Sequence, residues 1–519
     1  MTAPEWSGAF EASAERTLAL YQTPAMAVAV ARGGELAYAR GFGRRDRERD
    51  LPVGADTVFG IGSITKSFTC VAVMQLQERG RLSVQDGVQR FLPEFSTPDP
   101  EAARAITIHH LMTHSSGLPP LPSLYPAMAR SIAGDPAAPP QLAGGEVHPI
   151  DTPAELMDAI AHGDYRLLGP AGAHFSYSND GYALLGTIIE RASGQSYPAY
   201  LRQHIFEAAG MTTATLSPAA VAEMDDVATL YAVRQNADGT ETVYPAPQWW
   251  DAPAMLAAGF IKCSARDLLR YLEIYRTGGR VGSERILGAE SVAAMCRPHI
   301  AIDPASGYGY GLRVTPYHGA TLIEHSGGLK GIGAQVAVVP ERGVTGAALA
   351  NAAGAPSGIV LLRAVNGLLG LPLGTRRAEY AAVAPAPDRE ALAAYAGLYR
   401  SGEGARIEVS VDAGGLIFAT EGRRVPARHV GGDAFVVTQR EDETYARFLR
   451  DGGGAVWAVA FGSRIVLRAA SPAAASVEGR SGQRASTDGA RADGDSRRRP
   501  WPRGRGRWRG GRAALTGWK

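Results

Sequence analysis

Lysine is almost absent from this chain. Of the 53 lysines and arginines among its 519 residues, only four are lysines: Lys66, Lys262, Lys330 and Lys519. Arginine stays protonated at any pH that a protein meets, whereas a buried lysine can lose its proton and act as a base. Lys66 stands three residues after Ser63. The chain therefore places one of its few lysines beside a hydroxyl that a base can activate.

Three other absences exclude whole classes of protein. The three cysteines stand far apart, which excludes a disulfide framework and a cysteine metal site, and we expect reduced, buried thiols. No apolar run reaches the roughly 18 residues of a membrane span. The first residues lack the basic and apolar regions of a secretory signal. We therefore expect a cytoplasmic protein with no membrane segment.

The positive charge of the chain is concentrated near its C-terminal end. Residues 480–519 hold twelve basic and three acidic residues, so this segment contributes +9 to a net charge of +2 and the rest carries −7. A mildly acidic body argues against nucleic acid as an obligatory partner. The Arg, Gly and Trp of 497–509 are typical of segments that bind RNA or acidic surfaces. We favour a tail without function that binds anions only weakly.

Apolar periodicity gives the first 370 residues an α+β pattern. A Gly33-Gly34 step between two apolar runs predicts a hairpin over 24–43. The segment 118–150 is rich in Pro, Ala and Gly, which predicts an irregular loop and a candidate lid. Helices are expected at 64–79, 153–161 and 181–193, and strands at 321–323, 335–339 and 344–349.

The sequence changes in character after residue 375. Pro385-Ala386-Pro387 marks a linker, and short alternating segments then recur about every ten residues between Gly-rich turns. This spacing predicts a small all-β barrel. The residues after 470 have almost no aliphatic side chains, which is typical of disorder. We therefore divide the chain into a first domain at 1–372, a barrel at 385–470 and a disordered tail at 471–519.

Ser63 and Lys66 stand at the start of a helix that is apolar on most sides and therefore buried. Residues i and i+3 share one face of a helix, so the amine can reach the hydroxyl. The four-residue pattern alone is weak, because a capped helix start with an exposed lysine explains it as well. Tyr177 and Asn179 precede a second helix. A Tyr hydroxyl beside a Lys ammonium has a lowered pKa and can carry protons to a serine, and an Asn can orient the amine.

Four segments, in a fixed order, carry a resemblance to a known family. They are 56–63 (DTVFGIGS), 108–119 (IHHLMTHSSGLP), 175–182 (FSYSNDGY) and 327–331 (GGLKG). Together they resemble the β-lactamase-related serine hydrolases, which include class C β-lactamases, penicillin-recognising D-peptidases, D-aminopeptidases and esterases. The resemblance implies an α+β fold with a β-lactamase/transpeptidase-like antiparallel sheet flanked by helices. We expect the barrel that follows to be lipocalin-like.

The resemblance also implies a role for each matching residue. Ser63 would be the acylated nucleophile and Lys66 its proton acceptor. Tyr177 would relay protons to the leaving group and then activate water for deacylation, while Asn179 would hold the network. The backbone N–H groups of Ser63 and Gly328 would form the oxyanion hole.

His325 departs from the family pattern. β-Lactamases and cell-wall peptidases usually carry Lys-Thr/Ser-Gly at this place, where the Lys helps to bind the substrate carboxylate. A His is close to neutral at pH 7 and is a weaker anchor for anions. We expect His325, Ser326 and Gly327 to bind substrate. The change disfavours efficient β-lactam hydrolysis and favours esterase, amidase or D-aminopeptidase activity.

Other residues have less specific readings. His109, His110 and His114 are spaced like metal ligands, but no carboxylate stands nearby and their segment matches the family, so we expect no metal and no cofactor. We interpret Lys330 as a surface cation. Trp249-Trp250 fits either a pocket wall or the cover of a core edge.

The sequence thus predicts a serine hydrolase that acts through an acyl-enzyme on a small ester, amide or D-amino-acid-containing peptide. Its partner would be this substrate, and the oligomeric state is left open. The alternative is a noncatalytic protein that keeps the fold to bind peptides or cell-wall fragments. The complete set of Ser63, Lys66, Tyr177 and Asn179 argues against that alternative, because a binding protein has no need for a lysine of lowered pKa.

Overall fold

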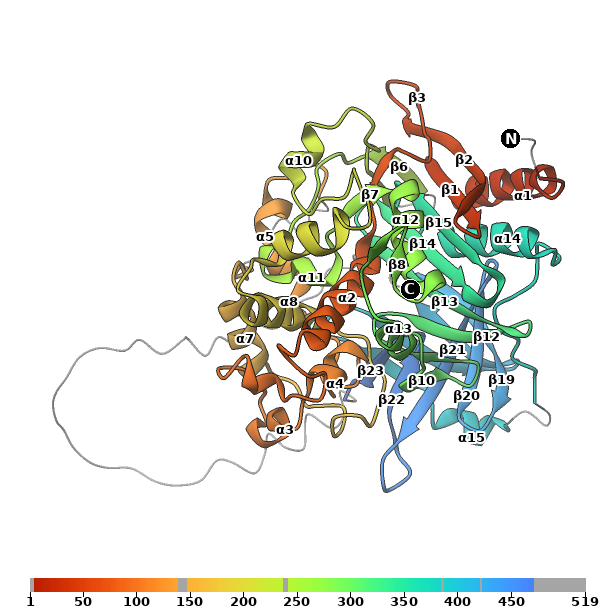
Figure 1. Cartoon of the computed structure of the whole chain (residues 1–519). Coiled ribbons are helices and arrows are strands. Elements are labelled where there is room, and N and C mark those ends of the chain that lie inside the picture. The colour runs from red at the N-terminus through yellow and green to blue at the C-terminus, as the bar shows by residue number, and fades with distance from the viewer. Residues whose placement is uncertain (1–3, 139–146, 237–240, 384–386, 421, 471–519) are drawn as a thin grey trace, which may run out of the picture.

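The computed structural model describes residues 4–138, 147–236, 241–383, 387–420 and 422–470. Figure 1 shows a sheet covered by helices and, beside it, a barrel formed by residues 397–468. The predicted disordered tail at 471–519 lies outside the described residues.

A nine-stranded antiparallel sheet forms the centre of the first body, in the order β10-β11-β12-β13-β14-β15-β1-β2-β3. The predicted hairpin is present, and Gly33 and Gly34 join its strands with positive φ angles of 63° and 89° that favour glycine. The predicted strands between 321 and 350 are present as well. The strands are β1 (Ala25–Arg32), β2 (Glu35–Asp46), β3 (Leu51–Pro52), β10 (Ile300–Asp303), β11 (Ser306–Tyr308), β12 (Arg313–Tyr317), β13 (Ala320–Leu329), β14 (Ile332–Val339) and β15 (Val344–Ala350).

The sheet separates two cores, and β1 contributes to both. Met26, Val28 and Val30 pack on one face with α1 (Ser7–Leu20) and α14 (Ser357–Leu369). Ala27, Ala29 and Ala31, which alternate with them, belong to the larger core on the other face. This division follows from the two-residue period of a strand. The small alanine side chains leave room for helices to approach that face closely.

The larger core holds the predicted central helix α2 (Thr65–Glu78), which is buried from Thr65 to Leu76. It packs against α8 (Asn179–Ser193), and α12 (Ala265–Thr277) covers the sheet beside it (Figure 1). The other helices are α3 (Pro100–Arg104), α4 (Ile108–Met112), α5 (Leu124–Ala133), α7 (Pro153–Ala161), α9 (Tyr197–Leu201), α10 (Pro218–Ala222), α11 (Leu256–Gly259), α13 (Ala289–Met295) and α15 (Arg389–Ala393). Short two-stranded sheets join β4 (Val58–Gly60) to β7 (Lys262–Ser264), β5 (Tyr231–Gln235) to β6 (Glu241–Pro245), and β8 (Arg280–Val281) to β9 (Glu284–Arg285).

The segment 118–150 differs from its prediction as an irregular loop. It contains α5, in which Leu124, Met128 and Ile132 recur every four residues and are buried. Pro and Ala in this stretch obscured a helical period that burial makes plain. Residues 139–146 lie outside the described part, so the lid prediction is not settled there.

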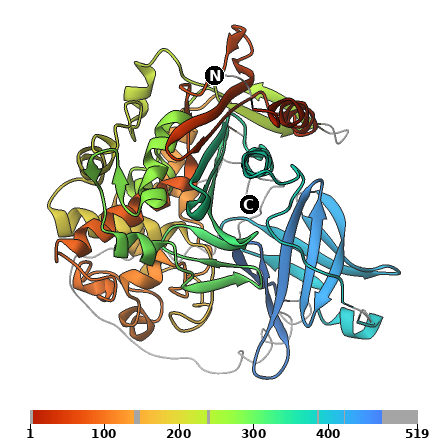
Figure 2. The same cartoon turned by 45° about the vertical axis from the view of Figure 1, so that its right-hand side comes forward.

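The predicted barrel is present as a closed, antiparallel, eight-stranded structure (Figure 2). Buried aromatic rings fill its interior, among them Tyr399, Phe418 and Phe448. The barrel is therefore a packed body. Its strands are β16 (Gly397–Arg400), β17 (Arg406–Asp412), β18 (Gly415–Thr420), β19 (Arg423–Gly431), β20 (Ala434–Gln439), β21 (Asp442–Arg450), β22 (Val456–Phe461) and β23 (Arg464–Arg468).

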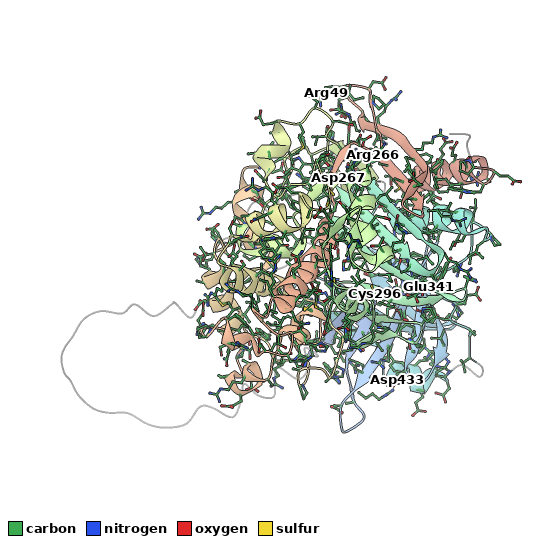
Figure 3. The ribbon with its side chains drawn as sticks, viewed as in Figure 1. Arg49, Arg266, Asp267, Cys296, Glu341 and Asp433 are labelled. Carbon is green, nitrogen blue, oxygen red and sulfur yellow. The ribbon has the colours of Figure 1, made fainter. Side chains whose placement is uncertain are left out.

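Two further observations concern the described residues only. No helix among them combines the length and apolar character that crossing a membrane requires. The three cysteines are unpaired: Cys70 and Cys263 are buried, and Cys296, which Figure 3 labels, is partly buried. Figure 3 also shows how densely side chains occupy the space between the helices and the sheet.

Candidate active site

Ser63 lies in a tight turn between β4 and α2. A short 3-10 helix, Gly62–Ile64, leads directly into α2, and Gly62 has a φ of 51°. A Cβ on Gly62 would stand 2.6 Å from the backbone nitrogen of Gly328 in β13. The turn therefore needs glycine for its conformation and for its closeness to β13. Ser63 itself stays partly exposed at the helix N-terminus.

Lys66 is completely buried one turn further along α2. Its Nζ lies 3.2 Å from Ser63 Oγ, 2.8 Å from Asn179 Oδ1 and 2.5 Å from the carbonyl oxygen of Ala258. A neutral amine has two N–H donors and one lone pair. The two carbonyl oxygens accept the two donors, so the lone pair is left for the Ser63 hydroxyl proton. This arrangement suits an amine that acts as a base.

The electrostatics agree with a neutral amine. Burial lowers the pKa of Lys66 well below its usual value, and the positive charge of Arg464 lowers it further. The negative charges of Glu403 and Asp180 act in the opposite direction. The aromatic ring of Tyr177 covers the amine, with Nζ 4.7 Å from the ring centroid. A lowered lysine pKa was predicted from the sequence, and the structure gives burial as its main cause.

Tyr177 lies in the segment that leads into α8. It is buried, and burial raises its pKa above the usual value of a tyrosine, although hydrogen bonding with Ser63 and the charge of Arg464 oppose the shift. The prediction of a lowered Tyr177 pKa was therefore wrong. It assumed a charged lysine as neighbour, whereas the cost of burying a phenolate dominates here. Tyr177 is a neutral hydroxyl that can pass a proton on.

Asn179 begins α8, and Ser178 before it caps the helix by accepting the Gly181 N–H. The Asn179 side chain is 5% exposed and bridges two bodies of the protein. Its oxygen faces Lys66, and its Nδ2 donates to Glu403 Oε1 of the barrel at 2.9 Å. The structure thus places the predicted Asn beside the predicted Lys, and also joins it to a residue that the sequence did not indicate.

Gly327 and Gly328 lie inside β13, where the strand passes the Ser63 turn. A Cβ on Gly327 would stand 1.9 Å from the Ile61 carbonyl oxygen and 3.2 Å from the Ser63 nitrogen. Only glycine permits this approach of two backbones. Gly328 and Ser326 are on the exposed side of the strand. The predicted oxyanion donors, Ser63 N–H and Gly328 N–H, are thus held on neighbouring segments.

His325 points to the buried side of β13 and is 6% exposed. Its Nδ1 lies 2.6 Å from the Ser326 carbonyl oxygen, so the proton is on Nδ1, and Nε2 accepts from Tyr308 Oη at 2.9 Å. Burial lowers the His325 pKa to about 3. His325 is therefore a neutral group behind Tyr177, with the two ring centroids 6.2 Å apart.

The three histidines of the family segment do not come together. His114 is buried, its ring lies 4.1 Å from that of Tyr177, and its Nδ1 accepts the Ser178 N–H. His109 and His110 lie elsewhere, half-buried, and His109 bonds to Tyr310 at 2.8 Å. Among the described residues no cluster of His, Cys, Asp and Glu could hold a metal ion.

Lys330, interpreted from the sequence as a surface cation, has a side chain that is only 6% exposed. Its Nζ lies 2.6 Å from Asp135, just after α5, and donates to the Gln248 carbonyl oxygen. Trp250 donates to the same Asp135 at 2.8 Å, which makes it a core residue, and Trp249 lines a small pocket with Lys262. The Lys330–Asp135 pair thus ties the end of β13 to α5.

The barrel contributes two charged residues that sequence reasoning missed. Glu403, in the turn before β17, and Arg464, at the start of β23, form an ion pair at 2.5 Å, and their side chains are 3% and 11% exposed. The Arg464 guanidinium lies 4.8 Å from the Tyr177 ring centroid. Backbone bonds reinforce the contact: Tyr177 N–H donates to Ser463 O, and Ile465 N–H donates to Ser176 Oγ. Nothing in the sequence near Glu403 or Arg464 signals this tertiary contact.

Comparisons with known proteins identify the family of the chain. The sequence profile of the family described as Beta-lactamase matches residues 10–368. The chain is 30% identical over 393 residues to Penicillin-binding protein 4 of Amycolatopsis lactamdurans. This alignment covers 74% of this chain and 95% of that protein. It is 32% identical over 188 residues to Esterase EstB of Burkholderia gladioli, which covers 35% of this chain and 44% of the esterase.

The fold of the whole described chain also has a solved counterpart. The octameric penicillin-binding protein homologue from Pyrococcus abyssi is 29% identical, with a TM-score of 0.62, and the match covers 89% of this chain and 100% of that one. A match over 89% of the chain is too long to end before the barrel. The chain therefore belongs to the β-lactamase family of serine hydrolases.

Proposed function

We propose that this protein is a serine hydrolase that forms an acyl-enzyme on Ser63 with a small ester, an amide or a D-amino-acid-containing peptide. One observation carries the proposal: the buried Lys66 Nζ lies within hydrogen-bonding distance of two carbonyl oxygens and of Ser63 Oγ. A neutral amine there donates to the two carbonyl oxygens and keeps its lone pair for the Ser63 proton. A serine with a neutral amine beside it is an activated nucleophile.

In acylation, the transfer of one proton would be coupled to the formation of one covalent bond. The Ser63 hydroxyl proton moves to Lys66 Nζ while Oγ bonds to the substrate carbonyl carbon. Backbone N–H groups of Ser63 and Gly328 stabilise the resulting oxyanion. When the intermediate collapses, Tyr177 gives its hydroxyl proton to the leaving group and takes one from the Lys66 ammonium. Because Tyr177 has a raised pKa, it starts this step protonated.

Deacylation would reverse the roles with water as nucleophile. Tyr177 passes a water proton to Lys66 as the hydroxide attacks the ester carbon. The second collapse returns a proton to Ser63 Oγ and releases the acid. Lys66 is then neutral again, and the charge of the site is unchanged over the cycle.

The state of His325 supports the choice of substrate class. It is neutral and buried where relatives of the penicillin-recognising type carry a lysine, so it offers a β-lactam carboxylate no cationic anchor. An ester or a peptide-like amide needs no charge at that position. We therefore expect faster acylation by an activated ester than by penicillin.

The experiment that tests the proposal is intact-mass spectrometry after brief exposure to p-nitrophenyl acetate and, separately, to penicillin. A single adduct on the wild type and none on Ser63→Ala is the expected result. The ester, rather than penicillin, should give the faster adduct. No adduct and no turnover with either reagent would favour the binding-protein alternative.

A further inference from the structure

The Asn179 amide has two ends that are not interchangeable. Lys66 must find an acceptor there, because an NH₂ group in place of Oδ1 would present hydrogens to the amine and compete with Ser63 for its lone pair. The oxygen and the nitrogen of an amide have nearly the same shape, so packing alone does not distinguish the two orientations. Some neighbour must select the orientation in which the oxygen faces Lys66.

Glu403 is that neighbour. A carboxylate accepts hydrogen bonds and donates none, so the Glu403 Oε1 atom, 2.9 Å from Asn179 Nδ2, requires the NH₂ end of the amide. Its second oxygen, Oε2, accepts from Arg464 Nε at 2.5 Å, which holds the carboxylate in place. Arg464 also donates to Ser463 Oγ and lies over the Tyr177 ring.

We propose that Glu403 and Arg464 of the barrel are a positioning pair of the active site: Glu403 fixes the orientation of the Asn179 amide, and Arg464 fixes Glu403 and balances its charge near Lys66. The inference rests on the proposed function, since it assigns the base role to Lys66. It makes the barrel a working part of the site.

The nearly isosteric change Glu403→Gln creates a conflict that tests the orientation. Arg464 requires an oxygen, so the amide introduced at position 403 would turn its oxygen to Arg464 and its NH₂ to Asn179. Asn179 then has to flip and present its own NH₂ to Lys66. We expect the rate of Ser63 acylation by p-nitrophenyl acetate to fall by about 100-fold, within the range of a lost general base.

Removing the cation should relieve the conflict. In the double variant Glu403→Gln with Arg464→Met, the oxygen of the introduced amide is free to face Asn179, and we expect acylation to recover by about tenfold over Glu403→Gln alone. Arg464→Met alone keeps the carboxylate acceptor and should cost less than Glu403→Gln. A purely structural role predicts the opposite, because the double variant loses more contacts. The proposal would be overturned if Ser63 in Glu403→Gln is acylated at the wild-type rate, or if it is acylated more slowly in the double variant than in Glu403→Gln.

A second ion pair of the barrel provides the matched control. Asp433, labelled in Figure 3, pairs with Arg450 at 2.9 Å, and both side chains are about one third exposed. Asp433→Asn and Arg450→Met remove equivalent charges from the same barrel away from Ser63. We expect both control variants to acylate like the wild type.

A measurement without substrate separates this proposal from the proposed function. Only four lysines are present, so a lysine label at the ε-carbon gives few NMR signals, and Lys66→Arg identifies that of Lys66. Loss of the Arg464 cation should raise the pKa of Lys66, and loss of the Glu403 charge should lower it, in line with the directions in which these charges act. Other ionisable groups that face Lys66 stay in place in both variants: Cys70, His114, Tyr177, Asp180, Tyr182 and His325.

Opposite shifts of the Lys66 signal in the two variants support the pair even if no ester acylates the wild type, in which case only the proposed function fails. If the pKa of Lys66 shifts equally in both variants, or in neither, the proposed positioning pair is contradicted even if the enzyme is active. The Arg464→Met titration alone decides the question if Glu403→Gln does not fold, since a Lys66 pKa that does not rise contradicts the proposal.

Discussion

The two sides of the site are built in different ways. Ser63 and Lys66 come from adjacent turns of one helical segment, so their contact depends on helix geometry alone. Glu403 comes from a turn of the barrel and Arg464 from the start of β23, and Glu403 reaches Asn179 across 224 residues of sequence. The comparison teaches that the nucleophile is encoded locally, whereas the orientation of its network depends on how a second body docks.

The largest expected effect is on the local side, at Lys66. In Lys66→Arg the guanidinium cannot lose its proton, so it cannot accept that of Ser63. We expect acylation by p-nitrophenyl acetate to fall by about 1,000-fold or more, because a base contributes roughly that much. Stopped-flow release of p-nitrophenol measures it, with Lys330→Arg as control. A Lys66→Arg protein that acylates within about tenfold of the wild type would contradict the base role.

Gly327→Ala tests the packing of β13 against the nucleophile turn. The new Cβ would lie 1.9 Å from the Ile61 carbonyl oxygen, so the strand must move away from Ser63 and widen the oxyanion hole. We expect acylation to slow by about 100-fold, the effect of losing one oxyanion donor. Gly87→Ala, where a Cβ meets nothing within 4 Å, is the control. Unchanged rates in a folded Gly327→Ala would show that this approach does not position the oxyanion donors.

The predictability of the molecule divides along the same line. The hairpin at β1 and β2, the buried helix α2 and the alternating strands of the barrel follow from local periods and glycine turns, so the sequence sufficed for them. The pKa of Tyr177 was predicted in the wrong direction because burial, which depends on tertiary packing, outweighs a neighbouring charge. Lys330 looks like a surface cation in the sequence because its partner, Asp135, is 195 residues away.

A further prediction concerns Asp180 and the dependence of the free energy of unfolding on pH. It is buried beside Asn179, and neither carboxylate oxygen has a well-formed hydrogen bond among the described residues, although Ser123 lies close enough to oppose the shift. Burial raises its pKa from 3.8 to about 6. Between these two values the folded state binds more protons than the unfolded state, so stability falls as pH rises through this window and then stays level.

Asp180→Asn removes that penalty. We expect the free energy of unfolding to rise above pH 6 by on the order of 3 kcal/mol, since about two pKa units at about 1.4 kcal/mol each are involved, and to change little below pH 3.8. Urea unfolding of both proteins above and below the window measures it. An equal change at both pH values would assign the effect to packing rather than to the charge.

The smallest expected effect concerns the barrel away from the site. Arg450→Met breaks a partly exposed ion pair with Asp433, and such pairs contribute at most about 1 kcal/mol. Urea unfolding should show a loss within that limit, and Ser63 acylation should not change. Slower acylation in this variant would mean that the acylation rate depends on the general stability of the barrel. If acylation is unchanged in Arg450→Met but falls strongly in Glu403→Gln, the active site depends on the Glu403 and Arg464 side chains and little on the rest of the barrel.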